Sequence, residues 1–122
     1  MSKYHAKKHR LDGYVFDSTA ELKRYCDLCL MKKAGEIHLL EIHPRFLLYP
    51  AIKRGKVKLR EVKYTADFAY TETKTGRRIV EDVKGMKTAE FKLRLKVFLR
   101  QHPDVHIRLV DKYGRIIEEY EP

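Results

Sequence analysis

Residues 62–84 read VKYTADFAYTETKTGRRIVEDVK, and this stretch decides the fold expected for the chain. Apolar and polar side chains alternate through it in two blocks, which is typical of β-strands. The block boundary, Thr73-Lys74-Thr75-Gly76, is typical of a turn. We therefore predict a long strand from about Leu59 to Tyr70 and a second strand from about Arg77 to Lys84, paired as a hairpin.

The alternation also assigns each acidic residue to a face, because successive side chains of a strand point to opposite sides. Asp82 and Lys84 are expected on one face of the second strand, and Glu81 on the other. With the two strands paired, Asp67 can lie on the face of Asp82, although a register slip of one residue would exchange Glu81 and Asp82. The face opposite Asp67 is expected to hold the other set of alternating side chains of the first strand: Val62, Tyr64, Ala66, Phe68 and Tyr70.

The flanking sequence predicts two helices and more strands. Ser18 to Glu21 has the spacing of a capping box, which begins a helix reaching about Lys33 and stopped by Gly35, and Thr88 can cap a second helix to about Gln101. Strands are expected over residues 45–52, 105–109 and 116–120, with turns at 53–56 and 111–114. The expected core side chains of the helices are Leu22, Tyr25, Cys26, Cys29, Leu30, Phe91, Leu95 and Phe98. The order is helix, three-strand meander, helix, two strands: an α+β fold with a mixed central sheet flanked by helices.

Length and composition indicate one folded domain. The 122 residues are 43% hydrophobic and 36% charged, which excludes a disordered or low-complexity chain, and no apolar run is long enough to span a membrane. Residues 1–10 lack the apolar core of a signal peptide, and two cysteines suit a reducing compartment. We expect a flexible basic arm at 1–10, a single domain at 11–122 and a cytoplasmic location.

Positive charge is concentrated in three segments. Lys and Arg number 27 against 17 Asp and Glu, for a net charge of +10. Residues 1–10 carry +4, residues 53–63 carry +5 and residues 87–100 carry +4, so the rest of the chain is net negative. Segregated positive charge indicates a polyanionic partner, and we favour nucleic acid over the alternative of three solvated faces. The candidate DNA contacts are Lys7, Lys8, Lys56, Lys58, Lys87, Lys92 and Lys96.

Asp67 and Asp82 are the candidate metal ligands. Two carboxylates a few ångströms apart raise each other's pKa unless a cation neutralises them, and hard oxygen ligands select Mg²⁺ or Mn²⁺. The ammonium of Lys84 could then hold and polarise a water molecule for attack on a phosphodiester. The alternative is a pair of edge-strand acids in which Lys84 simply forms an ion pair with Asp82.

With Glu21 on the first helix, then Asp67, then Asp82-Val83-Lys84 before a basic helix, the chain resembles the PD-(D/E)XK nuclease superfamily, with Ala66 in place of the proline. More narrowly it resembles a phage-borne family of small nucleases. That resemblance runs through residues 3–8 (KYHAKK), 16–18 (FDS), 34–37 (AGEI), 44–46 (PRF), 64–68 (YTADF) and 81–85 (EDVKG).

The resemblance implies a restriction-endonuclease-like core, similar to that of Holliday-junction resolvases and of transposon end-cleaving nucleases. It implies a Mg²⁺- or Mn²⁺-dependent endodeoxyribonuclease that hydrolyses branched DNA in phage recombination or DNA processing, in the bacterial host cell. A resolvase cuts two strands symmetrically, so that activity also implies a homodimer.

The resemblance also assigns roles to residues. Asp67 and Asp82 would be metal ligands with the Val83 carbonyl as a third, and Lys84 would orient the attacking water and offset charge in the transition state. Glu21 would complete the acidic cluster. The alternative for Glu21, at the third position of a capping box, is that it only caps the helix.

Three other interpretations remain open from the sequence. Cys26 and Cys29, followed by His38 and His43, could hold a structural zinc ion, although the spacing is short for a zinc finger. A non-catalytic DNA-binding module would keep the fold and the charge without chemistry. An RNA-binding accessory protein is supported by charge alone.

Overall fold

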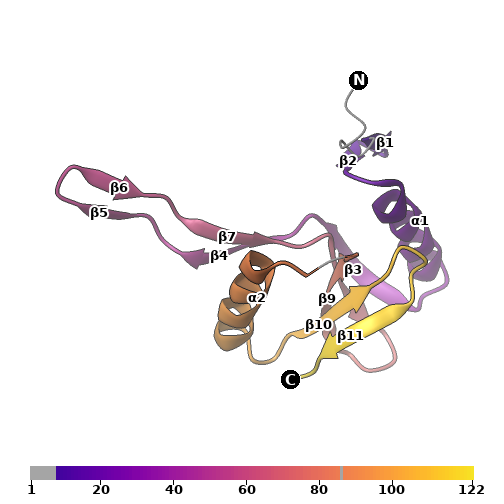
Figure 1. The fold of residues 1–122 in the computed structure, drawn as a ribbon. Helices are drawn as coiled ribbons and strands as arrows, with labels where there is room; N and C mark the ends of the chain where they lie inside the picture. Colours follow the sequence, from indigo (N-terminus) through magenta and orange to yellow (C-terminus); the bar gives the residue numbers. More distant parts are fainter. Residues whose placement is uncertain (1–7, 86) are drawn as a thin grey trace.

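A five-stranded sheet in the order β11-β10-β9-β8-β3 forms the centre of the molecule (Figure 1). The computed structural model describes residues 8–85 and 87–122. β9 and β10 are parallel and the other neighbours are antiparallel, so the sheet is mixed and the fold is α+β, as the sequence predicts. The strands are β3 (Ile37–Ile42), β8 (Phe68–Glu72), β9 (Arg78–Val83), β10 (His106–Val110) and β11 (Ile116–Tyr120).

Two helices begin where the sequence predicts them. Ser18 caps α1 (Thr19–Lys33) by accepting a hydrogen bond from the Glu21 N–H at 3.1 Å, and Thr88 caps α2 (Ala89–Gln101) in the same way. Gly35, with φ of 79°, follows the last turn of α1 and allows the left-handed conformation that ends it. α2 forms the crossover between the parallel strands β9 and β10.

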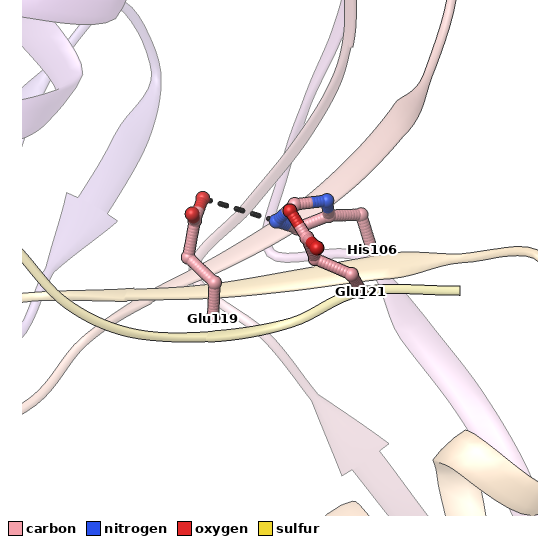
Figure 2. Close-up of side chains that lie close together, drawn as sticks. All are labelled: His106, Glu119 and Glu121. Carbon is pink, nitrogen blue, oxygen red and sulfur yellow. Dashed lines mark hydrogen bonds and ion pairs between the residues drawn. The ribbon is translucent and has the colours of Figure 1, made fainter.

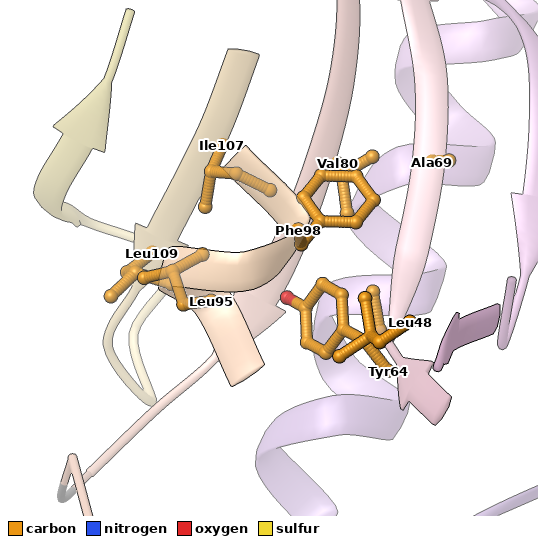
Figure 3. Close-up of a cluster of buried hydrophobic side chains, with 9 residues drawn as sticks. Leu48, Tyr64, Ala69, Val80, Leu95, Phe98, Ile107 and Leu109 are labelled. Atoms are coloured by element: carbon orange, nitrogen blue, oxygen red, sulfur yellow. The ribbon is translucent and has the colours of Figure 1, made fainter. Parts of the chain in front are cut away.

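Each helix covers a different face of the sheet. Leu95 and Phe98 of α2 pack with Val80 and Leu109 in one buried cluster (Figure 3). Tyr25 and Leu28 of α1 belong to a second cluster on the other face, together with Phe16, Ile37, Phe68, Tyr70 and Ile79. Neither helix is long and apolar enough to cross a membrane.

The prediction of which α1 residues face the core is partly wrong. The buried residues of α1 are Glu21, Tyr25 and Leu28, whereas Cys26 is exposed and Leu30 is 67% exposed. The buried residues follow the helical spacing i, i+4, i+7, one position earlier than most of the expected stripe. An acid therefore lies on the face that the helix presents to the rest of the protein.

The long strand predicted from Leu59 to Tyr70 is interrupted. β6 (Val57–Leu59), β7 (Val62–Thr65) and β8 are separate strands, and β7 ends just before Ala66 and Asp67. At this break the Ala66 N–H donates to the Pro44 carbonyl at 3.0 Å, and the His43 N–H donates to the Asp67 carbonyl at 2.9 Å.

The break changes the faces of the side chains. Tyr64 and Ala66 belong to the cluster under α2, whereas Phe68 and Tyr70 belong to the cluster under α1. The expectation that these four side chains share one face is therefore wrong, because strict alternation holds only within an unbroken strand.

The predicted strand at 45–52 lies outside the central sheet. β4 (Arg45–Tyr49) pairs with β7, and β5 (Ile52–Arg54) pairs with β6. Together these strands form a two-stranded ribbon that projects from the body of the molecule (Figure 1). We call residues 45–65 the hairpin extension. Lys53 and Arg54, expected in the turn, belong to β5.

β3 takes the place of the expected first strand of the meander, and it is a strand that the sequence does not predict. It pairs with β8, and its register shifts between His38 and Glu41, where Leu39 has a φ of 52°. This bulge disrupts the period of two by which a strand is recognised in a sequence.

A short hairpin precedes α1. β1 (His9–Leu11) pairs with β2 (Tyr14–Phe16), and the Tyr25 hydroxyl of α1 donates to Asp12 in the connecting turn at 2.7 Å. His9 and Arg10 thus belong to a strand, although they were expected in a flexible arm. The rest of that arm, residues 1–7, lies outside the described residues.

Candidate active site

The break between β7 and β8 places Asp67 beside Asp82. The Asp67 N–H donates to Asp82 Oδ1 at 2.8 Å, and the Val83 N–H donates to Asp67 Oδ2 at 2.7 Å. Phe68 and Glu81 are the last paired residues of the β8–β9 ladder. Side-chain carboxylates therefore take over the hydrogen bonds where the ladder stops, and the two predicted acids lie together as the alternation suggests.

Burial makes this pair costly to ionise. Asp82 is 1% exposed. Burial, the Asp82 carboxylate and the Glu21 carboxylate raise the pKa of Asp67 to about 8, against the opposing effects of the Val83 N–H and of Lys84. Burial also raises the pKa of Asp82, while Lys84 and the Tyr64 hydroxyl oppose that shift. A cation bound between these oxygens would favour the charged forms.

Tyr64 holds the second oxygen of Asp82. Its hydroxyl donates to Asp82 Oδ2, and burial together with the nearby Asp82 raises the pKa of Tyr64, so the hydroxyl stays a donor. Strict alternation along one strand predicts Tyr64 on the opposite face from the acids. Only the break after β7 turns it toward Asp82.

Glu21 reaches the site from α1. It is 5% exposed, and its Oε1 lies 2.7 Å from His43 Nε2. The cap of α1 uses the Ser18 side chain and the Glu21 backbone, whereas the Glu21 carboxylate is directed to His43. The carboxylate is therefore available to the acidic cluster. His43 was considered only as a zinc ligand, and no sequence pattern would pair it with Glu21.

Lys84 follows β9 at the edge of the acidic pair. Its N–H donates to the Val110 carbonyl at 2.9 Å, and its Nζ lies 4.4 Å from the centroid of the Phe91 ring on α2. Its positive charge partly offsets the rise in the pKa of both Asp67 and Asp82. No ion pair joins Lys84 to Asp82 within residues 8–85 and 87–122, so the simple ion-pair interpretation is not supported.

Glu81 points away from this site, as predicted. It is fully buried under α1, where Arg24 donates to both of its carboxylate oxygens at 2.7 and 2.8 Å. The Tyr70 hydroxyl donates to the same carboxylate at 2.6 Å. Glu81 thus joins α1 to the sheet and takes no part in the acidic cluster.

A groove of about 810 Å³ lies between the hairpin extension and the start of α2, with Lys84 in its wall. Its lining contains five basic and two acidic residues: Lys58, Arg60, Lys63, Lys84, Arg94, Glu61 and Glu90. Arg94 was not among the predicted contacts. Its Nη2 is 2.7 Å from Glu90, and its Nε is buried without a hydrogen-bond partner among the described residues.

The predicted DNA contacts are spread over several surfaces. Lys58 lines the groove, and Lys56 is exposed in the turn of the hairpin extension. Lys87 forms an ion pair with Glu118, Lys8 is exposed before β1, and Lys7 lies outside the described residues.

Lys92 and Lys96 do not line the groove. The basic residues of α2 therefore do not form a single face directed at it. Lys92 and Lys96 line a separate small hollow with Leu95, Leu99 and Tyr120. At 100° per residue, Lys92 is about 200° around the helix axis from Arg94, which does line the groove.

Glu21, Asp67 and Asp82 do not bring three ligand atoms as close together as a bound metal ion would require. Within the described ranges, His106, Glu119 and Glu121 alone place three ligand-type atoms within 4.8 Å of one another (Figure 2). His106 Nε2 lies 3.0 Å from Glu119, and Arg108 and Arg77 lie 2.8 and 3.7 Å from Glu119 and Glu121. These arginines already neutralise the two carboxylates, which makes this cluster an ion-pair network.

The structure does not gather the residues of the zinc alternative. Cys26 is exposed and Cys29 is half-buried, while His38 and His43 contact Thr73 and Glu21. Neither cysteine belongs to a group of three close ligand-type side chains in the part of the chain that the structure describes.

The raised pKa of Asp67 predicts that Asp67→Asn stabilises the metal-free protein. Because the folded pKa of about 8 exceeds the ordinary value of 3.8, the folded state binds more protons between these values, and stability falls as pH rises through the window. Asn resembles the neutral acid, so at pH 7.5 we expect a gain of about 1 to 3 kcal/mol in the free energy of unfolding. Urea denaturation in EDTA measures it.

The gain from Asp67→Asn should shrink as the pH is lowered toward 5. Asp104→Asn, at an exposed position, is the matched control and should change stability at neither pH. Equal gains at both pH values, or a loss at pH 7.5, would contradict the view that ionised Asp67 destabilises the folded state.

A family model described as "Protein of unknown function (DUF1064)" matches residues 1–116. No curated protein and no solved structure matches the chain.

Proposed function

Since the chain belongs to the DUF1064 family, we propose from its site that it is a divalent-metal-dependent endodeoxyribonuclease with a PD-(D/E)XK, restriction-endonuclease-like core. The observation that carries the proposal is the hydrogen-bonded pair of half-buried Asp67 and buried Asp82, with Lys84 beside it. Lys84 and Tyr64, whose hydroxyl donates to Asp82, line the basic groove, although the two aspartates themselves do not. Carboxylates, an ammonium group and a surface for a polyanion are the components that phosphodiester hydrolysis requires.

The residues present fit a hard divalent cation. Half-buried Asp67 and buried Asp82 supply oxygen donors whose pKa values are raised, which is the state expected of ligands without their cation. Asp67 and Asp82 would hold Mg²⁺ or Mn²⁺, with the Val83 carbonyl and Glu21 as further ligands, Glu21 directly or through water. The ion would supply polarisation of the phosphate and a lower pKa for water.

The chain's own side chains would prepare the reaction. The Lys84 ammonium would orient the attacking water and offset the negative charge that develops on the phosphate. Tyr64 fixes the orientation of Asp82 through its hydroxyl, and His43 fixes that of Glu21. These contacts keep the acids in place before substrate arrives.

The proposed substrate is DNA, with branched junctions favoured by the resemblance to resolvases. Net charge, the basic groove and the hairpin extension support a polyanionic partner. We propose a homodimer for symmetric cleavage, acting in phage recombination or DNA processing in the cytoplasm of the host cell.

Cleavage of matched four-way-junction, flap and linear duplex DNA with Mg²⁺ or Mn²⁺ tests the proposal. Paired symmetric nicks at the junction are expected. Equal cutting of linear duplex would retain the nuclease and reject the junction preference. Tight binding without cutting in either metal would reject catalysis and leave a DNA-binding module.

Lys84→Met should lower the cleavage rate by about 10²-fold or more while retaining the contact with Phe91. Methionine keeps most of the length of the side chain but removes the positive charge that acts on Asp67 and Asp82. Lys74→Met, in the turn between β8 and β9, is the matched control and should cleave at the wild-type rate. A Lys84→Met rate within about threefold of wild type would reject the proposed role of the ammonium.

A further inference from the structure

We infer that the hairpin extension, residues 45–65, is a clamp for duplex DNA that holds the phosphate backbone flanking the cleavage site. The inference rests on the proposed function for the identity of the polyanion as DNA. The extension begins at the break that carries Asp67, so a duplex held along it would lead directly to the acidic pair.

Among the described residues, the extension contributes to the buried core only near its base. Phe46, Leu48 and Tyr64 pack against α2 in the buried cluster. Beyond them, every residue of β5 and β6 is exposed, and no third strand covers the ribbon among the described residues (Figure 1). An uncovered two-stranded ribbon is only marginally stable by itself, so its surface is available to a partner.

Charge identifies the partner. Residues 45–65 carry seven basic side chains and one acid, Glu61, a net charge of +6 in a protein with +10 in total. Glu61 forms an ion pair with Lys63 at 3.0 Å. The other six basic residues of the extension have no ion-pair partner in the part of the chain that is described. A dense, uncompensated positive surface is complementary to the phosphate backbone.

The register directs part of this charge into the groove. Lys53 and Lys58 are directly opposed across β5 and β6, so they share a face, although like charges in such a pair repel. Lys58 lines the groove that also contains Arg94 and Lys84. An anion in the groove would relieve this repulsion. The opposite face of the ribbon carries Ile52, Val57 and Leu59 beside Arg54.

The length of the extension sets its reach. Ten residues separate Thr65 from Gly55 at the tip, about 33 Å of extended strand. At 3.4 Å per base pair this corresponds to about ten base pairs. A two-stranded ribbon also has the width that the major groove of B-DNA admits. The clamp should therefore require about one helical turn of duplex beside the cleavage site.

Salt-dependent binding to a 30-base-pair duplex in EDTA tests the clamp without any chemistry. The triple variant Lys53→Gln/Lys56→Gln/Lys58→Gln should bind at least about tenfold more weakly at 0.1 M salt, with a log–log salt slope lower by about 2 to 3. Lys32→Gln/Lys33→Gln/Lys74→Gln removes the same charge elsewhere, at exposed positions, and should keep the wild-type slope to within about 1. An equal loss in both variants, or none in the first, overturns the clamp.

A shortened chain with residues 52–59 replaced by an Asn-Gly turn supplies the second test. It should unfold at a temperature close to that of the wild type, because none of residues 52–59 belongs to the buried clusters that the described residues form. The shortened chain should bind as tightly as wild type to DNA that has no duplex beyond the cleavage site. It should bind more weakly than wild type only to DNA in which about ten base pairs of duplex flank that site. Loss of a dimer on shortening, with the salt slope unchanged, would instead assign the ribbon to self-association and overturn the clamp.

The two proposals fail separately. Extension-dependent binding by a wild-type protein that never cuts DNA would reject the nuclease and keep the clamp. In a second outcome, the shortened chain cleaves long-armed junctions as efficiently as wild type at subsaturating protein concentration. That result would reject the clamp and keep the nuclease.

Discussion

Asp82→Asn should lower the rate of the proposed metal-dependent DNA cleavage by at least about 10³-fold, the largest effect we expect from a single substitution. Asp82 is the most buried acid of the site, and both of its oxygens are held, one by the Asp67 N–H and one by the Tyr64 hydroxyl. Asn has the same shape but lacks the negative charge that would bind the divalent cation. Single-turnover cleavage of a junction in Mg²⁺ measures the loss.

DNA binding in EDTA should be unchanged or tighter in Asp82→Asn, because one negative charge near the phosphates is removed. The amide keeps one acceptor for the Asp67 N–H, so the thermal unfolding temperature should stay close to that of the wild type. Asp104→Asn is the control and should cleave normally. Cleavage by folded Asp82→Asn within about tenfold of wild type would reject Asp82 as a metal ligand.

Arg24→Met should destabilise the protein by about 3 to 5 kcal/mol, the largest stability effect we expect. Arg24 makes two hydrogen bonds with Glu81, whose side chain is completely buried between α1 and the sheet. Removing the guanidinium leaves a buried carboxylate with only the Tyr70 hydroxyl as a direct partner. Urea denaturation at pH 7 measures the loss.

The double variant Arg24→Met/Glu81→Leu should recover most of that loss, because no charge is then left unpaired. Arg78→Met is the matched control. Arg78 also pairs with a glutamate, Glu41, but that glutamate is exposed, so the loss should be about 1 kcal/mol or less. Similar losses of stability for Arg24→Met and Arg78→Met would contradict the expectation that an unpaired buried glutamate costs more than an unpaired exposed one.

The elements that rest on short-range signals were predictable from the sequence. The capping residues Ser18 and Thr88 and the Gly35 stop give both helices their bounds, because the groups that satisfy a helix end lie within a few residues of it. β9 follows the period of two, which correctly separates Asp82 from Glu81. Asp67 lies just before β8, and a short turn joins β8 to β9, which carries Asp82, so the two acids come close together.

The bend between the central sheet and the hairpin extension was not predictable. It depends on hydrogen bonds between His43–Pro44 and Ala66–Asp67, which are more than 20 residues apart in the chain. Residues 59–70 alternate as one strand would, and no local signal marks the position where the ladder stops.

By itself the sequence determined the two helices, the alternation that pairs Asp67 with Asp82, and the excess of positive charge. Only the tertiary structure decided that Tyr64 holds Asp82, that His43 holds Glu21, and that Arg94 and Lys58 share a groove. Caps and side-chain periods are properties of neighbouring residues. Contacts across a bend depend on which distant strands pair, and that pairing is fixed only when the whole core packs.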